Sequence, residues 1–168
     1  MVPHLNMLEI GAGTGGAMLP ILEGLSSTGT RSPKFANYDF TDLSPAFFDN
    51  GKKKVAKWSQ LVTFKSLDIE SDPLQQGYEL GSYDVIVAAN IVHATSRIES
   101  TMKRIRSVLK PGGTLVLIES TVETIATTLI LGTLSGWWSG KFHCFSLTRD
   151  FLTESSGGEE PREWASTD

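Results

Sequence analysis

A glycine-rich segment near the start of the chain has the spacing of a nucleotide-binding turn. Gly11, Gly13 and Gly16 satisfy the pattern Gly-x-Gly-x-x-Gly and directly follow a short apolar run at residues 5–10. Glycines in such a turn let the backbone approach a ligand at the carboxyl end of a strand. The spacing does not separate a dinucleotide from other adenosine cofactors. It predicts an adenosine-containing ligand and leaves its identity open.

Glu9 discriminates among these ligands, because it lies two positions before Gly11 at the end of the apolar run. A carboxylate there repels a pyrophosphate and attracts a cation. S-adenosylmethionine has no phosphate and carries an ammonium and a sulfonium group. Glu9 therefore favours S-adenosylmethionine over NAD. The alternative is that Glu9 is a solvated residue at the end of a strand.

Polar residues also follow the second and fourth predicted strands. Asp42 follows the second, where a carboxylate can accept hydrogen bonds from both hydroxyls of a ribose. A position at a helix N-terminus beside Ser44 is the competing interpretation, and the two roles are compatible. Asn90 comes just after the fourth strand and is placed to hold the methionine end of the cofactor.

The third predicted strand is followed by Asp68 and Ile69. Asp68 offers an acceptor for the amino group of adenine, and Ile69 offers an apolar face for the ring. The alternative for Asp68 is that it caps the turn before Pro73. The acidic and amide residues at successive strand ends are together much more specific than any one of them.

These residues are positioned by five apolar segments that alternate with helical patterns. We expect strands at residues 5–10, 35–40, 61–67, 83–89 and 114–119, and helices after the glycine turn, over 45–58 with Ser44 as N-cap, and over 97–109. This alternation predicts an α/β fold with a doubly wound, mostly parallel sheet. Ligands of such sheets bind at the carboxyl ends of the strands, where the polar residues described above follow the strands.

The length of 168 residues predicts one domain, and 40% hydrophobic residues predict a packed core. The net charge is −4, and the four lysines within residues 52–57 fit the solvated side of a helix. Nucleic acid is therefore not an expected partner. The single cysteine, Cys144, excludes an internal disulfide and a cysteine-based zinc site, so we expect no metal and a cytoplasmic location.

Neither export nor membrane insertion is expected from the sequence. The first residues lack the basic start and long apolar run of a signal peptide. The uncharged stretch at residues 124–138 is too short and too polar to span a bilayer.

Several segments resemble the C-methyltransferase domain of fungal highly reducing polyketide synthases, including the synthase halves of polyketide–peptide hybrids. The glycine turn and Lys-Pro-Gly-Gly at 110–113 occur in many methyltransferases. Asn-x-x-His-Ala-Thr at 90–95 and Gly-Trp-Trp at 136–138 are far more particular. The resemblance covers residues 5 to about 140. Further matching segments lie at residues 40–44, 67–70 and 77–84.

The resemblance implies the fold of class I S-adenosylmethionine-dependent methyltransferases, with a core over residues 1–140. It implies a catalytic pair in which His93 removes a proton from between the carbonyls of a β-ketoacyl thioester and Glu119 accepts the other ring N–H. The implied partner is an acyl carrier protein whose phosphopantetheine holds that thioester, or other synthase domains. The implied cofactor-binding residues are Glu9, Gly11, Gly13, Asp42, Asp68 and Asn90.

Two departures from the family pattern lead to further expectations. The family has a helical lid before the first strand, whereas this sequence starts almost at that strand, and residues 141–168 do not resemble the segment that builds the last two strands. We therefore expect a sheet without its last strands, disorder from about residue 150, and weak or no catalysis by this chain alone.

Two other functions remain open. One is a free-standing methyltransferase that acts on oxygen or nitrogen of a small metabolite. The pair of His93 and Glu119 argues against this function, because oxygen and nitrogen acceptors seldom need a base of this strength. The other is a catalytically silent domain that binds only the cofactor or a partner.

Overall fold

The computed structural model describes residues 4–26 and 33–119. The predictions for the segment after Glu119 therefore lie outside the described residues. They include the domain boundary at residue 140, the Trp137–Trp138 pair, the absence of further strands and the disordered tail.

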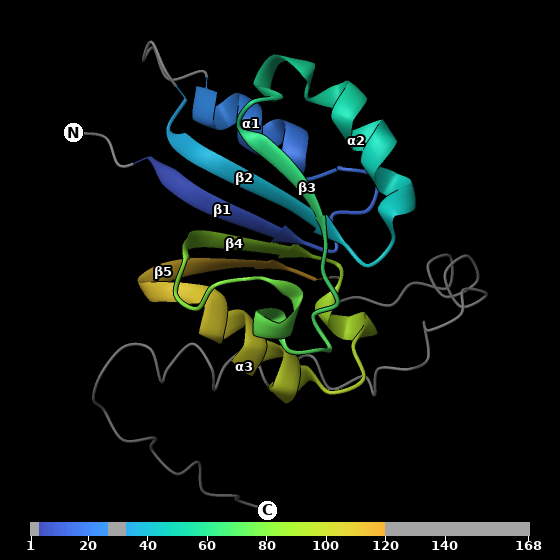
Figure 1. Cartoon of the computed structure of the whole chain (residues 1–168), viewed down its shortest axis with the longest axis vertical. Helices are drawn as coiled ribbons and strands as arrows, with labels where there is room; N and C mark the ends of the chain where they lie inside the picture. Colours follow the sequence, from blue (N-terminus) through green and yellow to red (C-terminus); the bar gives the residue numbers. More distant parts are fainter. Residues whose placement is uncertain (1–3, 27–32, 120–168) are drawn as a thin grey trace, which may run out of the picture.

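The described residues form one five-stranded sheet in which every neighbouring pair of strands is parallel (Figure 1). The strand order is β3-β2-β1-β4-β5, so the order reverses between β1 and β4. This confirms the predicted α/β fold with a doubly wound sheet. The strands are β1 (Leu5–Ile10), β2 (Phe35–Asp42), β3 (Val62–Ser66), β4 (Tyr83–Ala89) and β5 (Leu109–Ile118).

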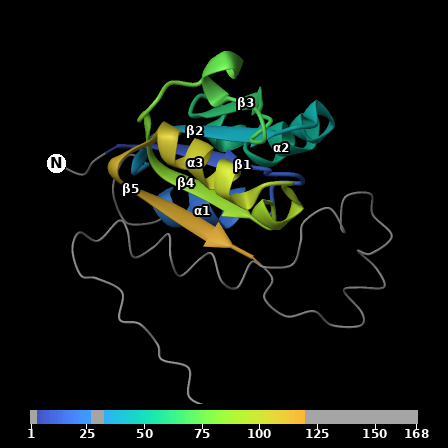
Figure 2. The same ribbon diagram turned by 90° about the horizontal axis from the view of Figure 1, so that it is seen from below.

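Helices cover both faces of the sheet (Figures 1 and 2). Met7 of β1 packs in one apolar cluster with Met18 and Leu22 of α1, whereas Leu8 packs in a second cluster with Ile105 of α3. Neighbouring residues of a strand point to opposite faces, so α1 and α3 lie on opposite sides of the sheet. The helices are α1 (Met18–Ser26), α2 (Phe48–Lys54) and α3 (Ile98–Val108), with 3-10 turns η1 (Pro45–Phe47), η2 (Ala56–Trp58), η3 (Pro73–Gln76) and η4 (Val92–Ala94).

The continuous helix predicted over residues 45–58 is wrong, because the segment is divided into η1, α2 and η2. Val55 leaves the helical conformation, with φ −105° and ψ 22°, and both Val55 and Trp58 are buried in the α1-side cluster. Side chains three residues apart line up in a 3-10 turn, which lets both reach the core. Ser44 is not a side-chain N-cap here; its amide instead donates to the carboxylate of Asp42.

β5 begins five residues before the predicted start at Thr114. Leu109 pairs with Tyr83 and Thr114 pairs with Val85, so residues 110–113 bulge opposite Asp84. Lys110 secures this bulge, because its Nζ lies 2.8 Å from each carboxylate oxygen of Asp84. In the described part of the chain, no helix is long and apolar enough to cross a membrane.

Candidate functional site

The reversal of strand order brings two loops together at the carboxyl ends of β1 and β4 (Figure 1). The glycine loop follows β1, and the loop with Ile91 and His93 follows β4. The two are in direct contact, because a Cβ on Gly11 would lie 2.5 Å from Cγ1 of Ile91. This is the switch point of a doubly wound sheet, where a ligand is expected.

The glycine loop has the backbone conformation that its sequence predicts. Gly11 and Gly13 have φ values of 64° and 51°, in the left-handed region that favours glycine. Asp42 supports the loop from the end of β2: its Oδ2 accepts a hydrogen bond from Gly13 N at 2.8 Å, and its Oδ1 accepts one from Ser44 N at 2.9 Å. Within the described part of the chain, a Cβ on Gly13 would have only the carbonyl oxygen of Gly11 within 4 Å. The missing side chain therefore leaves room for a ligand at the loop.

Glu9 is buried, with 2% of its surface exposed, so a solvated position at the strand end is wrong. Its Oε2 accepts a hydrogen bond from the hydroxyl of Tyr38 at 2.7 Å. Burial raises the pKa of Glu9 to about 7, against the opposing effect of the Tyr38 hydrogen bond. The carboxyl is therefore divided between its two protonation states near neutral pH, and a cation at this edge would favour the ionised form.

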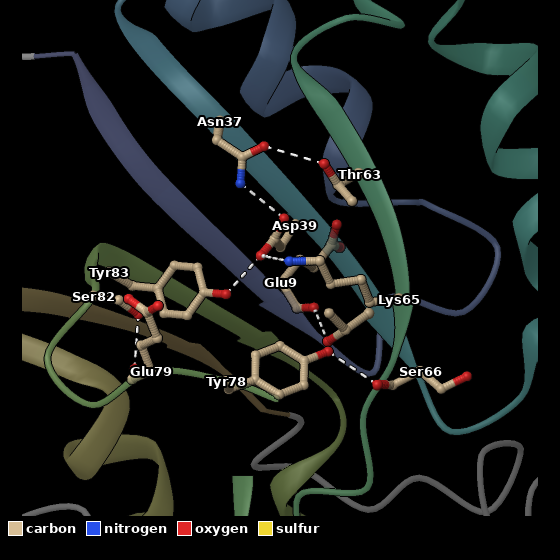
Figure 3. Close-up of polar contacts among 11 residues, drawn as sticks. Glu9, Asn37, Asp39, Thr63, Lys65, Ser66, Tyr78, Glu79, Ser82 and Tyr83 are labelled. Atoms are coloured by element: carbon tan, nitrogen blue, oxygen red, sulfur yellow. Dashed lines mark hydrogen bonds and ion pairs between the residues drawn. The ribbon is translucent and has the colours of Figure 1, made fainter. Parts of the chain in front are cut away.

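A second buried carboxylate, Asp39 of β2, was not predicted from the sequence (Figure 3). Its Oδ2 accepts hydrogen bonds from Tyr83 at 2.6 Å and Lys65 at 2.9 Å, and its Oδ1 accepts one from Asn37 at 2.8 Å. Lys65 comes from the neighbouring strand β3, Tyr83 comes from β4 beyond β1, and Asn37 lies in β2 itself. The signal in the sequence was an acidic residue inside the strand predicted at residues 35–40. We assign this network a structural role, because all of the carboxylate's contacts are to side chains of the sheet.

The structure places Asp68 in the competing role of a turn cap. Its Oδ1 accepts a hydrogen bond from Glu70 N at 2.9 Å, and its Oδ2 accepts one from the hydroxyl of Ser71 at 2.7 Å. Ile69 packs in the α3-side cluster and is 6% exposed, so little of its side chain is accessible to a ring. Leu43, directly after Asp42, is 71% exposed and is a better-placed apolar surface. The sequence analysis did not single out Leu43.

Asn90 occupies a strained position at the end of β4. It is the single non-glycine residue with positive φ in the described chain, at 52°, and its side chain is exposed. Asparagine tolerates this conformation better than most residues. Its backbone N–H donates to Ile118 O at 2.7 Å, which joins the start of the His93 loop to the end of β5.

His93 and Glu119 are in contact, as the sequence analysis expected. His93 lies in η4, and its Nδ1 is 2.5 Å from Oε2 of Glu119, just after β5. The other oxygen of Glu119 accepts hydrogen bonds from Ile91 N at 3.1 Å and Val92 N at 2.8 Å. The side chain of Glu119 is 6% exposed and is held by these hydrogen bonds, whereas the side chain of His93 is 29% exposed.

The hydrogen bond to Glu119 raises the pKa of His93, and partial burial of the ring opposes the shift. When the ring is neutral with its proton on Nδ1, Nε2 is its basic nitrogen. The arrangement therefore fits a general base whose charged form is stabilised by a carboxylate. Among residues 4–26 and 33–119, no group of three or more histidine, cysteine or acidic side chains is placed to hold a metal ion.

Comparison with known proteins agrees with this geometry. Residues 8–115 match a family described as a methyltransferase domain. The chain is 50% identical over 138 residues to highly reducing polyketide synthase 40 of Fusarium pseudograminearum, which covers 82% of this chain and 5% of that protein. The chain thus spans a small part of the curated relatives that it matches.

Two solved structures are similar over most of the chain. The C-methyltransferase domain of the citrinin polyketide synthase is 32% identical with a TM-score of 0.78, over 93% of this chain and 41% of that one. The trans-methyltransferase CalH, solved in complex with SAH, is 40% identical with a TM-score of 0.77, over 82% of this chain and 38% of that one. These matches confirm the resemblance to polyketide synthase C-methyltransferase domains, and the chain belongs to the methyltransferase domain family.

Proposed function

We propose that this chain is an S-adenosylmethionine-dependent C-methyltransferase domain that methylates the α-carbon of a carrier-bound β-ketoacyl thioester. The observation that carries the proposal is the contact between His93 and Glu119, next to a glycine loop at the switch point of the sheet. Methylation of oxygen or nitrogen has little need of such a base. The similarity to C-methyltransferase domains of polyketide synthases supports the same choice.

The residues around the glycine loop fit S-adenosylmethionine. Gly11 and Gly13 let the backbone approach the ligand, and we assign the ribose hydrogen bonds to Asp42 at the end of the adjacent strand. We assign the methionine end to Asn90, which is exposed at the end of β4, whereas the buried Glu9 at the end of β1 contributes charge rather than a direct contact. Leu43 replaces Ile69 as the apolar surface that we assign to adenine, because Leu43 is exposed and Ile69 is buried. The cofactor supplies an electrophilic methyl group on a positively charged sulfur.

The chemistry of this chain's own residues is the removal of a proton. In this proposal, Nε2 of His93 removes a proton from the α-carbon between the two carbonyls of the thioester. The resulting enolate forms the new bond from its α-carbon to the methyl group. Glu119 holds the imidazole by Nδ1 and stabilises the imidazolium that results. Glu119 also fixes the backbone at Ile91 and Val92, so the base and its support form one unit.

The partner that we propose is an acyl carrier protein with a phosphopantetheine-bound β-ketoacyl chain. The relatives of this chain are segments of multidomain polyketide synthases, so other synthase domains are its natural neighbours. Phosphopantetheine is a long flexible arm, so it can deliver the acyl group to a site at the carboxyl ends of the strands while the carrier protein stays outside.

The position of the new methyl group tests the proposal. The full chain is incubated with S-adenosylmethionine labelled in its methyl group and a β-ketoacyl thioester of phosphopantetheine, and the product is analysed by NMR. We expect the label on the α-carbon. Label on oxygen would instead identify an O-methyltransferase, and cofactor binding without transfer would identify a silent binding domain.

A further inference from the structure

Glu70 joins the loop after β3 to the loop after β4. Its Oε1 accepts a hydrogen bond from Ser96 N at 2.6 Å and a second one from the hydroxyl of Ser96. The two residues are 26 positions apart in the sequence. Both are exposed, so the contact contributes to the shape of the surface at the site rather than to the core.

The contact with Glu70 holds the end of the turn that carries His93. Glu119 accepts hydrogen bonds from Ile91 N and Val92 N, the two residues that precede His93. Thr95 closes the turn, because its backbone N–H and its hydroxyl both donate to Val92 O. Ser96 follows at once and is held by Glu70. Two carboxylates, one after β3 and one after β5, thus hold the turn on either side of His93.

Glu70 is itself oriented by the turn that contains Asp68. Oδ1 of Asp68 accepts a hydrogen bond from Glu70 N at 2.9 Å, and Asp68 N donates to Oε1 of Gln76 at 2.8 Å. The turn that contains Asp68 is therefore connected through Glu70 and Ser96 to the turn that holds His93.

We propose that Glu70 is a positioning residue that fixes the His93 turn relative to the Asp68 turn after β3. The hydrogen bonds described above support the positioning of the His93 turn by Glu70, whereas the expected effect on the rate of methyl transfer rests on the proposed function. A general base works only when it is aligned with its substrate, and a displacement of about 1 Å can cost a factor of ~100 in rate. Loss of Glu70 is therefore expected to affect catalysis more than folding.

Four variants of the full chain separate position from charge. Glu70→Ala removes the acceptor and the charge, whereas Glu70→Gln removes the charge and keeps an acceptor oxygen. Glu99→Gln is the control for charge, because Glu99 is also exposed and accepts a hydrogen bond at 2.6 Å, but from Lys103 within α3 and not from the His93 turn. Ser96→Ala removes one donor of the contact without any change of charge.

The first readout is the pKa of the His93 ring, followed by NMR of histidine-labelled protein and assigned with His93→Gln. We expect the pKa to fall toward the ordinary value of ~6.5 in Glu70→Ala, because the contact with Glu119 loosens. Glu70→Gln and Glu99→Gln should keep the raised pKa. An unchanged pKa in Glu70→Ala would overturn the proposal, and so would an equal fall in Glu70→Gln, which would show an effect of charge.

The second readout is methyl transfer. We expect Glu70→Ala to lower kcat by roughly 10-fold or more, with the dissociation constant of S-adenosylmethionine changed by less than about 2-fold. If Glu70→Ala does not fold, Ser96→Ala tests the proposal instead. We expect a smaller fall of the His93 pKa in Ser96→Ala, and an unchanged pKa would contradict the proposal. A pKa that falls in a chain without any methyl transfer would refute the proposed function while the role of Glu70 stands. Normal transfer in Glu70→Ala would refute that role.

Discussion

Gly11 and Ile91 are so close that a methyl group on Gly11 would lie 2.5 Å from Cγ1 of Ile91. The glycine loop and the His93 loop therefore fit together only because Gly11 has no side chain. A change in either loop is expected to displace the other.

Gly11→Ala is expected to weaken the binding of S-adenosylmethionine and to lower methyl transfer together. The added methyl overlaps Ile91 and forces the loops apart, at a cost of ~1–3 kcal/mol in stability. The measurement is calorimetric titration with the cofactor, combined with the transfer assay. Gly112→Ala is the matched control, because Gly112 also has positive φ, at 75°, but a Cβ there would meet no atom of residues 4–26 and 33–119 within 4 Å. Equal effects of the two substitutions would show that backbone strain alone matters.

Glu9→Gln is expected to flatten the pH dependence of folding stability. Burial raises the pKa of Glu9 from 4.5 to about 7, so the folded state holds this proton more tightly than the unfolded state. The stability that this group contributes is complete below pH ~4.5 and is lost as pH rises through about 7, with a size on the order of 3 kcal/mol. Urea denaturation of both proteins between pH 4.5 and 8 measures the difference.

The hydrogen bond to Glu119 also raises the pKa of His93, but His93 is present in both proteins and cancels in the comparison. We expect the glutamine variant to be relatively more stable at pH 8 than at pH 4.5. A difference between the two proteins that does not vary with pH would contradict the burial of an ionisable Glu9.

Asp42→Ala is expected to weaken the binding of S-adenosylmethionine by about 1–3 kcal/mol, because a charged acceptor for the ribose and the support of Gly13 N are both lost. Asp72→Ala is the control, since Asp72 also accepts a backbone hydrogen bond, from Leu74 N at 3.0 Å, but at the exposed start of η3. Isothermal titration calorimetry measures both. Unchanged affinity in Asp42→Ala would remove Asp42 from the binding site.

Glu119→Gln is expected to lower kcat by about 100-fold or more while cofactor affinity stays the same. The amide oxygen can still accept from Ile91 N and Val92 N, so the loop is retained, but the imidazolium of His93 loses its counter-charge. The pKa of His93 should fall, and the pH at which the rate rises should move to lower values. A rate profile with an unchanged inflection would show that Glu119 does not act through His93.

The parts of the fold that could be predicted from the sequence are those with a continuous local pattern. β1 and β4 are mostly apolar and bounded by turn residues, and their bounds were predicted correctly. The helix over 45–58 was mispredicted because the burial of Val55 and Trp58 overrides local helical preference. The bulge at residues 110–113 depends on Asp84, which is distant in the sequence.

The same distinction applies to the candidate site. The strand-end rule placed Asp42, Asp68 and Asn90 at one edge, but it did not show which groups their side chains contact. Asp68 turned out to cap its own turn, and Ile69 to face the core. The contact between Glu70 and Ser96 left no trace in any local pattern, because it joins two loops that only the tertiary fold brings together.

The rate of α-carbon methylation by His93→Ala shows whether His93 is the base for carbon methylation. Labelled S-adenosylmethionine and a β-ketoacyl thioester on a phosphopantetheine carrier are supplied to the full chain, to His93→Ala and to His4→Ala, in which an exposed histidine before β1 is removed. We expect His4→Ala to keep the rate of the unmodified chain, and His93→Ala to lose it while still binding the cofactor. Methylation of the α-carbon that persists in His93→Ala would show that another group removes the proton.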